Sequence, residues 1–212
     1  MTQSILNYRL SERDRGMFNP YLHEVLDAIE SLRGSTGDEL AFELLKRRDE
    51  FTSRFAFSIP TPETLRLVGA HSPLVEIGAG SGYWAACLTK MGADIIAYDL
   101  RVPGEESPWD WRSSNQWFDD TWFPVEEGDE TEAERHAGRS LFLCWPPPED
   151  GMAFRALKSY LDAGGATVIY IGNPESSGDG AFHRELARMK AAHIARTFSW
   201  PFVNEIVSVH LA

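Results

Sequence analysis

Cysteine is scarce in this sequence: Cys87 and Cys144 are the only two, and their spacing fits neither a zinc site nor a disulfide framework. Because each stands inside an apolar segment, we expect two buried free thiols, which favours a cytoplasmic protein. The six histidines show no metal-ligand spacing, so no metal site is expected. No apolar run approaches the roughly 18 residues of a membrane helix, and the N-terminal residues lack the apolar stretch of a signal peptide. The sequence therefore predicts no membrane partner.

Basic residues are also few: 20 lysines and arginines stand against 32 aspartates and glutamates, for a net charge of −12. Residues 104–134 concentrate this excess, with eleven acids and the single base Arg112. Because phosphate contacts supply most nucleic-acid affinity, this balance argues against a nucleic-acid partner. At 212 residues and 43% hydrophobic content, the chain can form one domain with a real core.

A glycine-rich turn between two short apolar runs is the most informative segment. Residues 74–82 read Leu-Val-Glu-Ile-Gly-Ala-Gly-Ser-Gly, and the second apolar run, 95–98, ends in Asp99. Apolar residues recur at helical spacing across 83–91, between these two runs. The order strand, glycine turn, helix, strand and acid predicts a nucleotide-binding βαβ unit. An acid at the tip of the second strand can accept hydrogen bonds from both ribose hydroxyls.

The spacing of the glycines narrows the choice of nucleotide. Gly78, Gly80 and Gly82 follow G-x-G-x-G rather than the dinucleotide pattern G-x-G-x-x-G, and Glu76 stands two residues before the first of them. These glycines can adopt positive φ and, lacking a Cβ, let a ligand lie on the backbone. The segment resembles motif I, E/D-x-G-x-G-x-G, of the class I S-adenosylmethionine (SAM)-dependent methyltransferases. A nicotinamide dehydrogenase and an α/β domain with a purely structural turn are the alternatives.

The resemblance implies SAM as the cofactor and a set of contacts to it. SAM has no pyrophosphate, but it carries an ammonium and a sulfonium, whose positive end Glu76 could favour. Asp99 would bind the ribose, and Asp129 would lie near the adenine amino group. The full set of expected cofactor-binding residues is Glu76, Gly78, Ala79, Gly80, Gly82, Asp99, Leu100, Asp129 and Trp145.

Strands alternate with helices through the rest of the chain, which predicts an α/β fold. Strands are expected at 123–125, 140–144, 166–171, 194–200 and 206–211, and helices at 130–137, 152–161 and 181–192. The last two strands should form a hairpin, so one strand is antiparallel. This order matches a Rossmann-like, seven-stranded, mostly parallel sheet with helices on both faces. We expect residues 71–212 to form this SAM-binding domain and residues 1–70 an N-terminal helical cap, with helices near 20–32, 38–55 and 62–68.

The segment after the fourth strand reads Cys144-Trp145-Pro146-Pro147-Pro148, where amino methyltransferases carry N/D-P-P-Y/F. Trp145 replaces the hydrogen-bond acceptor and Pro148 the aromatic ring, and an indole donates one hydrogen bond but accepts none. This departure argues against N-methylation of nucleobases. We expect Trp145 and Pro146 to face the reacting methyl group, with an indole–sulfonium contact of about 0.5 to 2 kcal/mol. The alternative is that Trp145 packs under the cap.

A narrower resemblance uses the same motif. Segments 59–60, 76–84, 143–147 and 170–172 together are similar to a group of uncharacterised methyltransferase-domain proteins that share a W-P-P signature. This likeness supports the cofactor and implies nothing about the acceptor.

An acidic, tryptophan-rich loop, residues 101–122, follows Asp99. It contains Trp109, Trp111, Trp117 and Trp122, and it lacks periodicity, which predicts a lid over the site. Its acids would favour a cationic or amine-bearing acceptor through long-range attraction. The alternative is a solvated acidic surface with its tryptophans packed on the sheet edge.

These expectations combine into one function. The sequence predicts a SAM-dependent methyltransferase that acts on a small-molecule acceptor. The alternative is a SAM-binding regulatory or partner protein without methyl transfer.

Overall fold

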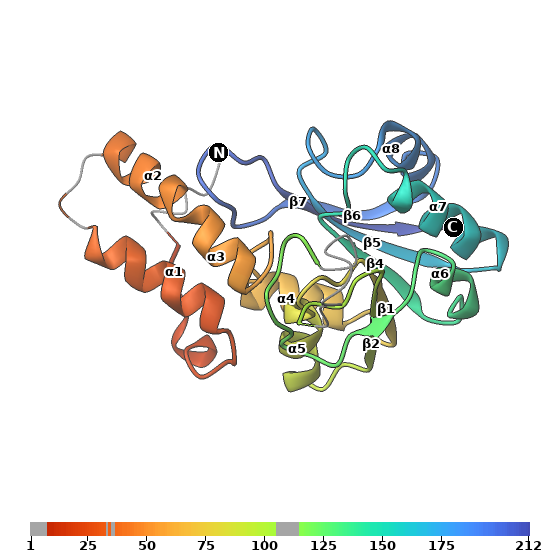
Figure 1. Cartoon of the computed structure of the whole chain (residues 1–212), viewed down its shortest axis with the longest axis horizontal. Helices are drawn as coiled ribbons and strands as arrows, with labels where there is room; N and C mark the ends of the chain where they lie inside the picture. The colour runs from red at the N-terminus through yellow and green to blue at the C-terminus, as the bar shows by residue number, and fades with distance from the viewer. Residues whose placement is uncertain (1–7, 33, 35–36, 105–114) are drawn as a thin grey trace, which may run out of the picture.

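The computed structural model describes residues 8–32, 34, 37–104 and 115–212 and contains a seven-stranded sheet (Figure 1). The strands lie in the order β3-β2-β1-β4-β5-β7-β6. Neighbours from β3 to β5 are parallel, whereas β7 runs antiparallel to both β5 and β6. The strands are β1 (Leu74–Ile77), β2 (Ile95–Asp99), β3 (Glu126–Glu127), β4 (Ser140–Cys144), β5 (Thr167–Gly172), β6 (Lys190–Arg196) and β7 (Ile206–Leu211). The predicted mostly parallel sheet with one antiparallel strand is confirmed.

Helices cover both faces of the sheet, also as predicted. The core on one face includes α5 (Tyr83–Lys90) and extends into the N-terminal helices α1 (Pro20–Ser31), α2 (Gly37–Lys46), α3 (Arg48–Arg54) and α4 (Pro62–Gly69). The other face packs on α6 (Glu132–Arg135), α7 (Met152–Asp162) and α8 (Gly180–Leu186). In β4, Phe142 belongs to the first core, and Leu141 and Leu143 to the second, because successive side chains alternate across a strand. Figure 1 shows α1 and α2 at the end of the molecule opposite α6–α8.

The N-terminal helices begin at capping residues that the sequence indicates. The Asn19 side chain accepts a hydrogen bond from the Leu22 amide at 3.1 Å, and Pro20 occupies the first turn of α1. Thr61 forms a capping box with Thr64 at the start of α4. These helices share one hydrophobic core with the sheet. The predicted boundary near residue 70, between the helical cap and the SAM-binding domain, therefore remains a prediction.

Aromatic side chains join the N-terminal helices to the chain's last hairpin. The ring of Tyr21 stacks on that of Phe55 at 4.8 Å, and the Trp200 indole donates a hydrogen bond to the Tyr21 hydroxyl at 3.0 Å. Tyr21, Phe55 and Trp200 are all buried. These contacts hold the end of α3 and the 197–205 loop on the same side of the sheet, where the candidate site lies.

Several element boundaries differ from the sequence expectations. The predicted helix 38–55 is interrupted at Arg47, and the third strand follows Pro124 rather than containing it, because proline cannot donate to the ladder. The predicted helix 181–192 ends at Leu186, and β6 begins at Lys190 rather than at residue 194. Its segment Ala-Ala-His-Ile-Ala reads as helix by propensity, but pairing with β7 decides the outcome.

The described residues show neither a bilayer-spanning helix nor a metal cluster. In the described ranges, no helix has the length and apolarity that crossing a bilayer requires. Three or more metal-ligating side chains do not come together anywhere in those ranges. Both cysteines are free thiols. Cys144 is only half-buried because it stands at the end of β4, where the carboxyl ends of the parallel strands lie.

Candidate functional site

The glycine turn lies at the carboxyl edge of the sheet, between β1 and α5. The neighbours of β1 are β2 on one side and β4 on the other, so the chain changes direction at this point, where α/β sheets hold ligands. The amides of Gly78 and Ala79 both donate to the Tyr98 carbonyl, at 2.9 and 3.0 Å. The turn is thereby fixed against β2.

Asp99 meets this turn directly. Its Oδ2 accepts a hydrogen bond from the Gly80 amide at 2.7 Å, and its Oδ1 accepts one from the Arg101 amide at 3.0 Å. Burial raises the pKa of Asp99 above its ordinary value, and the two amide hydrogen bonds oppose that shift. A carboxylate can accept further hydrogen bonds on each oxygen. Asp99 therefore retains acceptor capacity for ligand hydroxyls beside the glycine turn.

Two other predicted cofactor residues lie on the exposed side of this edge. Leu100 has 62% of its surface exposed. Asp129 is exposed, and its Oδ1 accepts hydrogen bonds from the Thr131 amide at 2.9 Å and hydroxyl at 2.6 Å. Those hydrogen bonds lower the pKa of Asp129. Asp129 thus has a structural task at the start of α6 besides the predicted contact to adenine.

Protein side chains pack directly against the glycine turn. Gly80 has a φ of 56°, and a Cβ there would overlap the ring of Phe118, which is 9% exposed. A Cβ at Gly82 would lie 2.8 Å from Cγ2 of Val125, and one at Gly78 would lie 2.8 Å from Cε of Met152. In this conformation, packing therefore favours glycine at these three positions, in addition to the predicted approach of a ligand.

Residues 115–125, which we call the strap, hold Phe118 in this position. The Asn115 side chain donates to the Arg101 carbonyl at 2.7 Å. At the other end, the Trp122 amide donates to the Ser81 carbonyl at 2.7 Å, and its indole donates to the Arg54 carbonyl at 2.6 Å. The strap is therefore fastened on both sides of the turn.

The strap forms the described part of the predicted lid. The ring of Trp122 packs on Phe55 at 5.2 Å, whereas Trp117 remains 60% exposed beside Phe57. Trp109 and Trp111 lie outside the described residues, and the lid remains a prediction.

Glu76 is buried beneath the turn, with 1% of its surface exposed. Its Oε2 finds no hydrogen-bond partner among the described residues. Burial, reinforced by the nearby Asp99 carboxyl, raises the pKa of Glu76 to about 8. Glu76 is therefore mostly neutral at pH 7 in this conformation, and an adjacent cation would favour its ionisation.

This raised pKa predicts a pH-dependent stability. Between about pH 4.5 and pH 8, Glu76 is ionised in the unfolded chain but protonated in the folded one, so the free energy of unfolding should decrease as pH rises. Each pH unit is worth about 1.4 kcal/mol for such a group. In urea titrations, Glu76→Gln should lose less stability than wild type between pH 5 and pH 8. Exposed Glu126→Gln should behave as wild type, and equal losses in all three proteins would contradict the assignment.

Trp145, the predicted catalytic residue after β4, is anchored by a buried acid. Its indole nitrogen donates to Oε2 of Glu205 at 2.5 Å, and the Ser58 hydroxyl donates to Oε1 of the same carboxyl at 2.7 Å. Glu205 is 2% exposed, and burial raises its pKa to about 7 against the opposing effect of these hydrogen bonds. The Trp145 ring stacks on Phe57 at 6.0 Å. The single donor of the indole is therefore occupied, and its faces remain for packing or ligand contact.

Pro146 fixes the same turn from the other side. It is buried, and its carbonyl accepts a hydrogen bond from the Gly178 amide at 2.8 Å. Trp145 has a φ of 51°, a conformation uncommon for a residue with a side chain. The Trp145 amide donates to the Ile171 carbonyl at 2.7 Å, which holds this conformation at the end of β5.

Five residues at or near the site were not predicted from the sequence: Glu205, Ser58, Phe57, Arg48 and Phe118. A signal existed for Glu205: an antiparallel final strand starts at the edge where the parallel strands end, and Ile206 indeed pairs with Gly172. Arg48 stands in a run of charged residues and gives no such signal.

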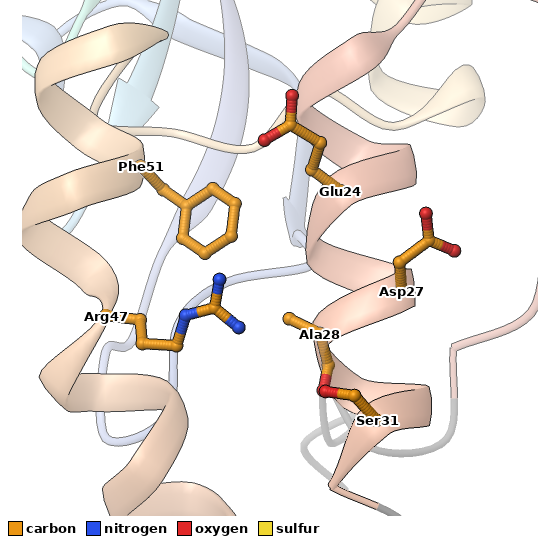
Figure 2. A pocket seen from close by; sticks show the side chains of 6 residues that line it. All are labelled: Glu24, Asp27, Ala28, Ser31, Arg47 and Phe51. Carbon is orange, nitrogen blue, oxygen red and sulfur yellow. The ribbon is translucent and has the colours of Figure 1, made fainter.

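A hollow of about 280 Å³ lies elsewhere, between α1 and α3 (Figure 2). Arg47 and Phe51 point into it from α3 and its start, and Ala28 lies opposite them on α1. Its lining residues are Glu24, Asp27, Ala28, Ser31, Arg47 and Phe51. None of them belongs to the glycine turn, to Asp99 or to Trp145, so the hollow is separate from the candidate site.

Comparison with known proteins identifies distant structural relatives. No family model and no curated protein matches the sequence. Magnesium protoporphyrin IX methyltransferase from Synechocystis, solved with bound SAM, is 13% identical, with a TM-score of 0.46 over 97% of this chain and 99% of that one. A Pyrococcus abyssi tRNA (uracil-54, C5)-methyltransferase, in complex with S-adenosyl-L-homocysteine, is 14% identical over 71% of this chain, with a TM-score of 0.45. The present chain covers 37% of that tRNA enzyme.

The strand order of the sheet decides the fold class. A parallel core in the order 3-2-1-4-5, followed by an antiparallel seventh strand between the fifth and the sixth, agrees with the predicted mostly parallel sheet whose last two strands form a hairpin. The chain has a Rossmann-like, seven-stranded α/β fold. In this fold, the glycine turn and Asp99 occupy the ends of the first two strands, and Trp145 follows the fourth.

Proposed function

We propose that this protein is a SAM-dependent methyltransferase that acts on a small-molecule acceptor. The observation that carries the proposal is the contact of Asp99 with the Gly80 amide at the switch point of the sheet. This contact places an acid that can bind ribose hydroxyls next to a glycine turn on which a ligand can lie. The buried Glu76 oxygen without a partner among the described residues supports a polar or cationic ligand group nearby.

The cofactor would be held by residues from three strand ends. Asp99 would accept the ribose hydroxyls, Asp129 would lie toward the adenine, and Glu76 beneath the turn would favour the positive methionyl end. Bound SAM would supply an activated methyl group on a sulfonium, a good leaving group. The protein's task would then be to position the acceptor in line and exclude water. Trp145, held by Glu205, would offer its indole face to the cationic centre.

The net charge of the chain and the packing of the strap over the turn both favour a small-molecule acceptor. The chain carries a net charge of −12, which opposes approach to a nucleic-acid backbone. The strap covers the turn with Phe118, which suits a site that closes around a compact substrate. The tRNA specificity of one structural relative makes RNA the competing acceptor to test.

Incubation with labelled SAM tests this function. The protein would be mixed with labelled SAM and, separately, with a cell metabolite extract and a total tRNA pool. We expect label in a low-molecular-weight product and none in tRNA. Label in tRNA alone would contradict the small-molecule acceptor.

A SAM-binding protein without methyl transfer is the second candidate. The substitution of Trp145 and Pro148 for the acceptor and aromatic residues of the usual motif favours it, since the indole donor is already bonded to Glu205. Saturable SAM binding with no transfer to either pool would support this candidate over the methyltransferase.

The position of Phe118 predicts that cofactor binding requires the strap to move. Phe118→Ala removes the ring from Gly80, and the free energy of exposing a buried phenylalanine, about 1.5–3 kcal/mol, no longer opposes opening. We therefore expect tenfold or greater tightening of S-adenosylhomocysteine (SAH) binding in calorimetry, at about 1.4 kcal/mol per tenfold. The adjacent, exposed Trp117→Ala is the matched control. Weaker SAH binding in Phe118→Ala would mean that the ring belongs to the binding surface instead.

A further inference from the structure

Arg48 lies beside the aromatic rings at the candidate acceptor side of the site. Its guanidinium carbon is 5.7 Å from the centre of the Trp145 ring and 6.0 Å from that of Phe57. The two rings stack on each other with an angle of 25° between their planes, and both are half-buried. One cation therefore adjoins two partly open aromatic side chains.

The guanidinium also has an unused donor. The Nε atom of Arg48 is buried and finds no hydrogen-bond acceptor among the described residues. Within those residues, Arg48 forms no ion pair, not even with the nearby Glu205 carboxyl, which accepts hydrogen bonds from Ser58 and Trp145. A buried donor on a charged group is costly when it lacks an acceptor, so a missing partner is indicated.

The chemistry of this partner follows from the donor. A guanidinium presents its N–H groups in one plane, which matches the two oxygens of a carboxylate. The aromatic rings beside it favour a flat or sulfonium-bearing group next to that carboxylate. Trp145 follows β4, whereas Asp99 ends β2 on the other side of β1. A cofactor with its ribose on Asp99 would direct its methionyl end toward Arg48.

We propose that Arg48, with the rings of Phe57 and Trp145, forms a carboxylate-binding subsite next to the reacting centre. The proposal rests on the methyltransferase function. The carboxylate belongs either to the methionyl end of the cofactor or to an aromatic acceptor. This assignment departs from the cationic acceptor that the acidic loop predicts: Asp119 and Asp120 of the strap are exposed, whereas the cation Arg48 adjoins the rings, near the Glu205 carboxyl that accepts from the Trp145 indole.

The first arm of the test addresses the cofactor carboxylate. Calorimetry would compare SAH with 5′-methylthioadenosine, which lacks the amino-acid portion, on wild type, Arg48→Gln and Arg47→Gln. Arg47 is the matched control because it precedes Arg48 and lies over Phe51 instead, 5.2 Å from that ring. If the subsite holds the cofactor, Arg48→Gln weakens SAH binding about tenfold or more and leaves 5′-methylthioadenosine unchanged. Arg47→Gln leaves both unchanged.

The second arm addresses an acceptor carboxylate. Indole-3-acetate, indole-3-acetamide and tryptamine would be titrated into each protein, with and without saturating SAH. An acceptor carboxylate at Arg48 gives wild type a preference for the acetate, which Arg48→Gln abolishes and Arg48→Lys restores in part. Thermal unfolding of each variant establishes that it is folded.

The outcomes separate this proposal from the function on which it rests. Equal binding of every probe by folded Arg48→Gln and wild type overturns the subsite, as does a wild type that binds no probe. A wild type that binds neither nucleoside but shows an Arg48-dependent preference for indole-3-acetate overturns the methyltransferase function and retains the carboxylate site. A selective loss of SAH affinity in Arg48→Gln supports both.

Discussion

Replacing Asp99 with alanine is expected to weaken binding of SAM and SAH by about 1.5–3 kcal/mol, the worth of hydrogen bonds to a charged group. Its carboxylate joins the Gly80 and Arg101 amides, at 2.7 and 3.0 Å, and stands where a cofactor's ribose would lie. The loss would therefore combine missing ribose contacts with a loosened glycine turn. Calorimetry with SAH would measure it directly.

Two variants separate these contributions. Asp99→Asn keeps the shape and one acceptor oxygen but removes the charge, so it should retain more affinity than the alanine variant. Asp162→Ala removes an exposed carboxylate on α7 that pairs with Lys158, and it should bind SAH as wild type does. Full SAH affinity in a folded Asp99→Ala protein would exclude the ribose role.

Valine at Gly80 is expected to abolish measurable SAH binding. The backbone there has a φ of 56°, which side chains branched at Cβ strongly disfavour, and the added atoms would overlap the Phe118 ring. The strap and the cofactor face of the turn would both be displaced. Circular dichroism should show that the sheet remains folded, and calorimetry should show no saturation with SAH.

The control for Gly80→Val is a glycine with free space around it. A Cβ at Gly138 would meet nothing within 4 Å, so Gly138→Val should leave SAH affinity unchanged. The double variant Gly80→Ala, Phe118→Ala removes the overlap with the ring. If folded Gly80→Val binds SAH with wild-type affinity, and the double variant binds it as tightly as Phe118→Ala alone, the glycine serves only the packing of the strap.

The parallel core could be predicted because local signals determine it. The same holds for the part of the site that the glycine turn and Asp99 form. β1, β2 and β4 are short apolar runs that end at glycines, an acid or a proline motif, and their predicted limits agree with the structure. Parallel neighbouring strands end at the same edge, so Asp99 had to lie near the glycine turn. The contact of its Oδ2 with the Gly80 amide follows from that arrangement.

The part of the site around Trp145 depends on contacts between segments that are distant in the sequence. Glu205 reaches Trp145 only because the final strand inserts next to β5, and Arg48 reaches the same ring from the N-terminal helices. Neither pairing has a periodicity or spacing that marks it in the sequence. The start of the edge strand β6 was misplaced for a related reason: its alanines favour a helix locally, whereas pairing with β7 makes the segment a strand.

The most direct test of the account is calorimetry of wild-type protein with SAH, SAM and NAD. A SAM site at the glycine turn predicts saturable binding of SAH and SAM at micromolar concentrations. It predicts no heat with NAD, because the turn and Asp99 would hold a nucleoside without a pyrophosphate site. Saturation with NAD, together with no heat from SAM or SAH, would contradict it.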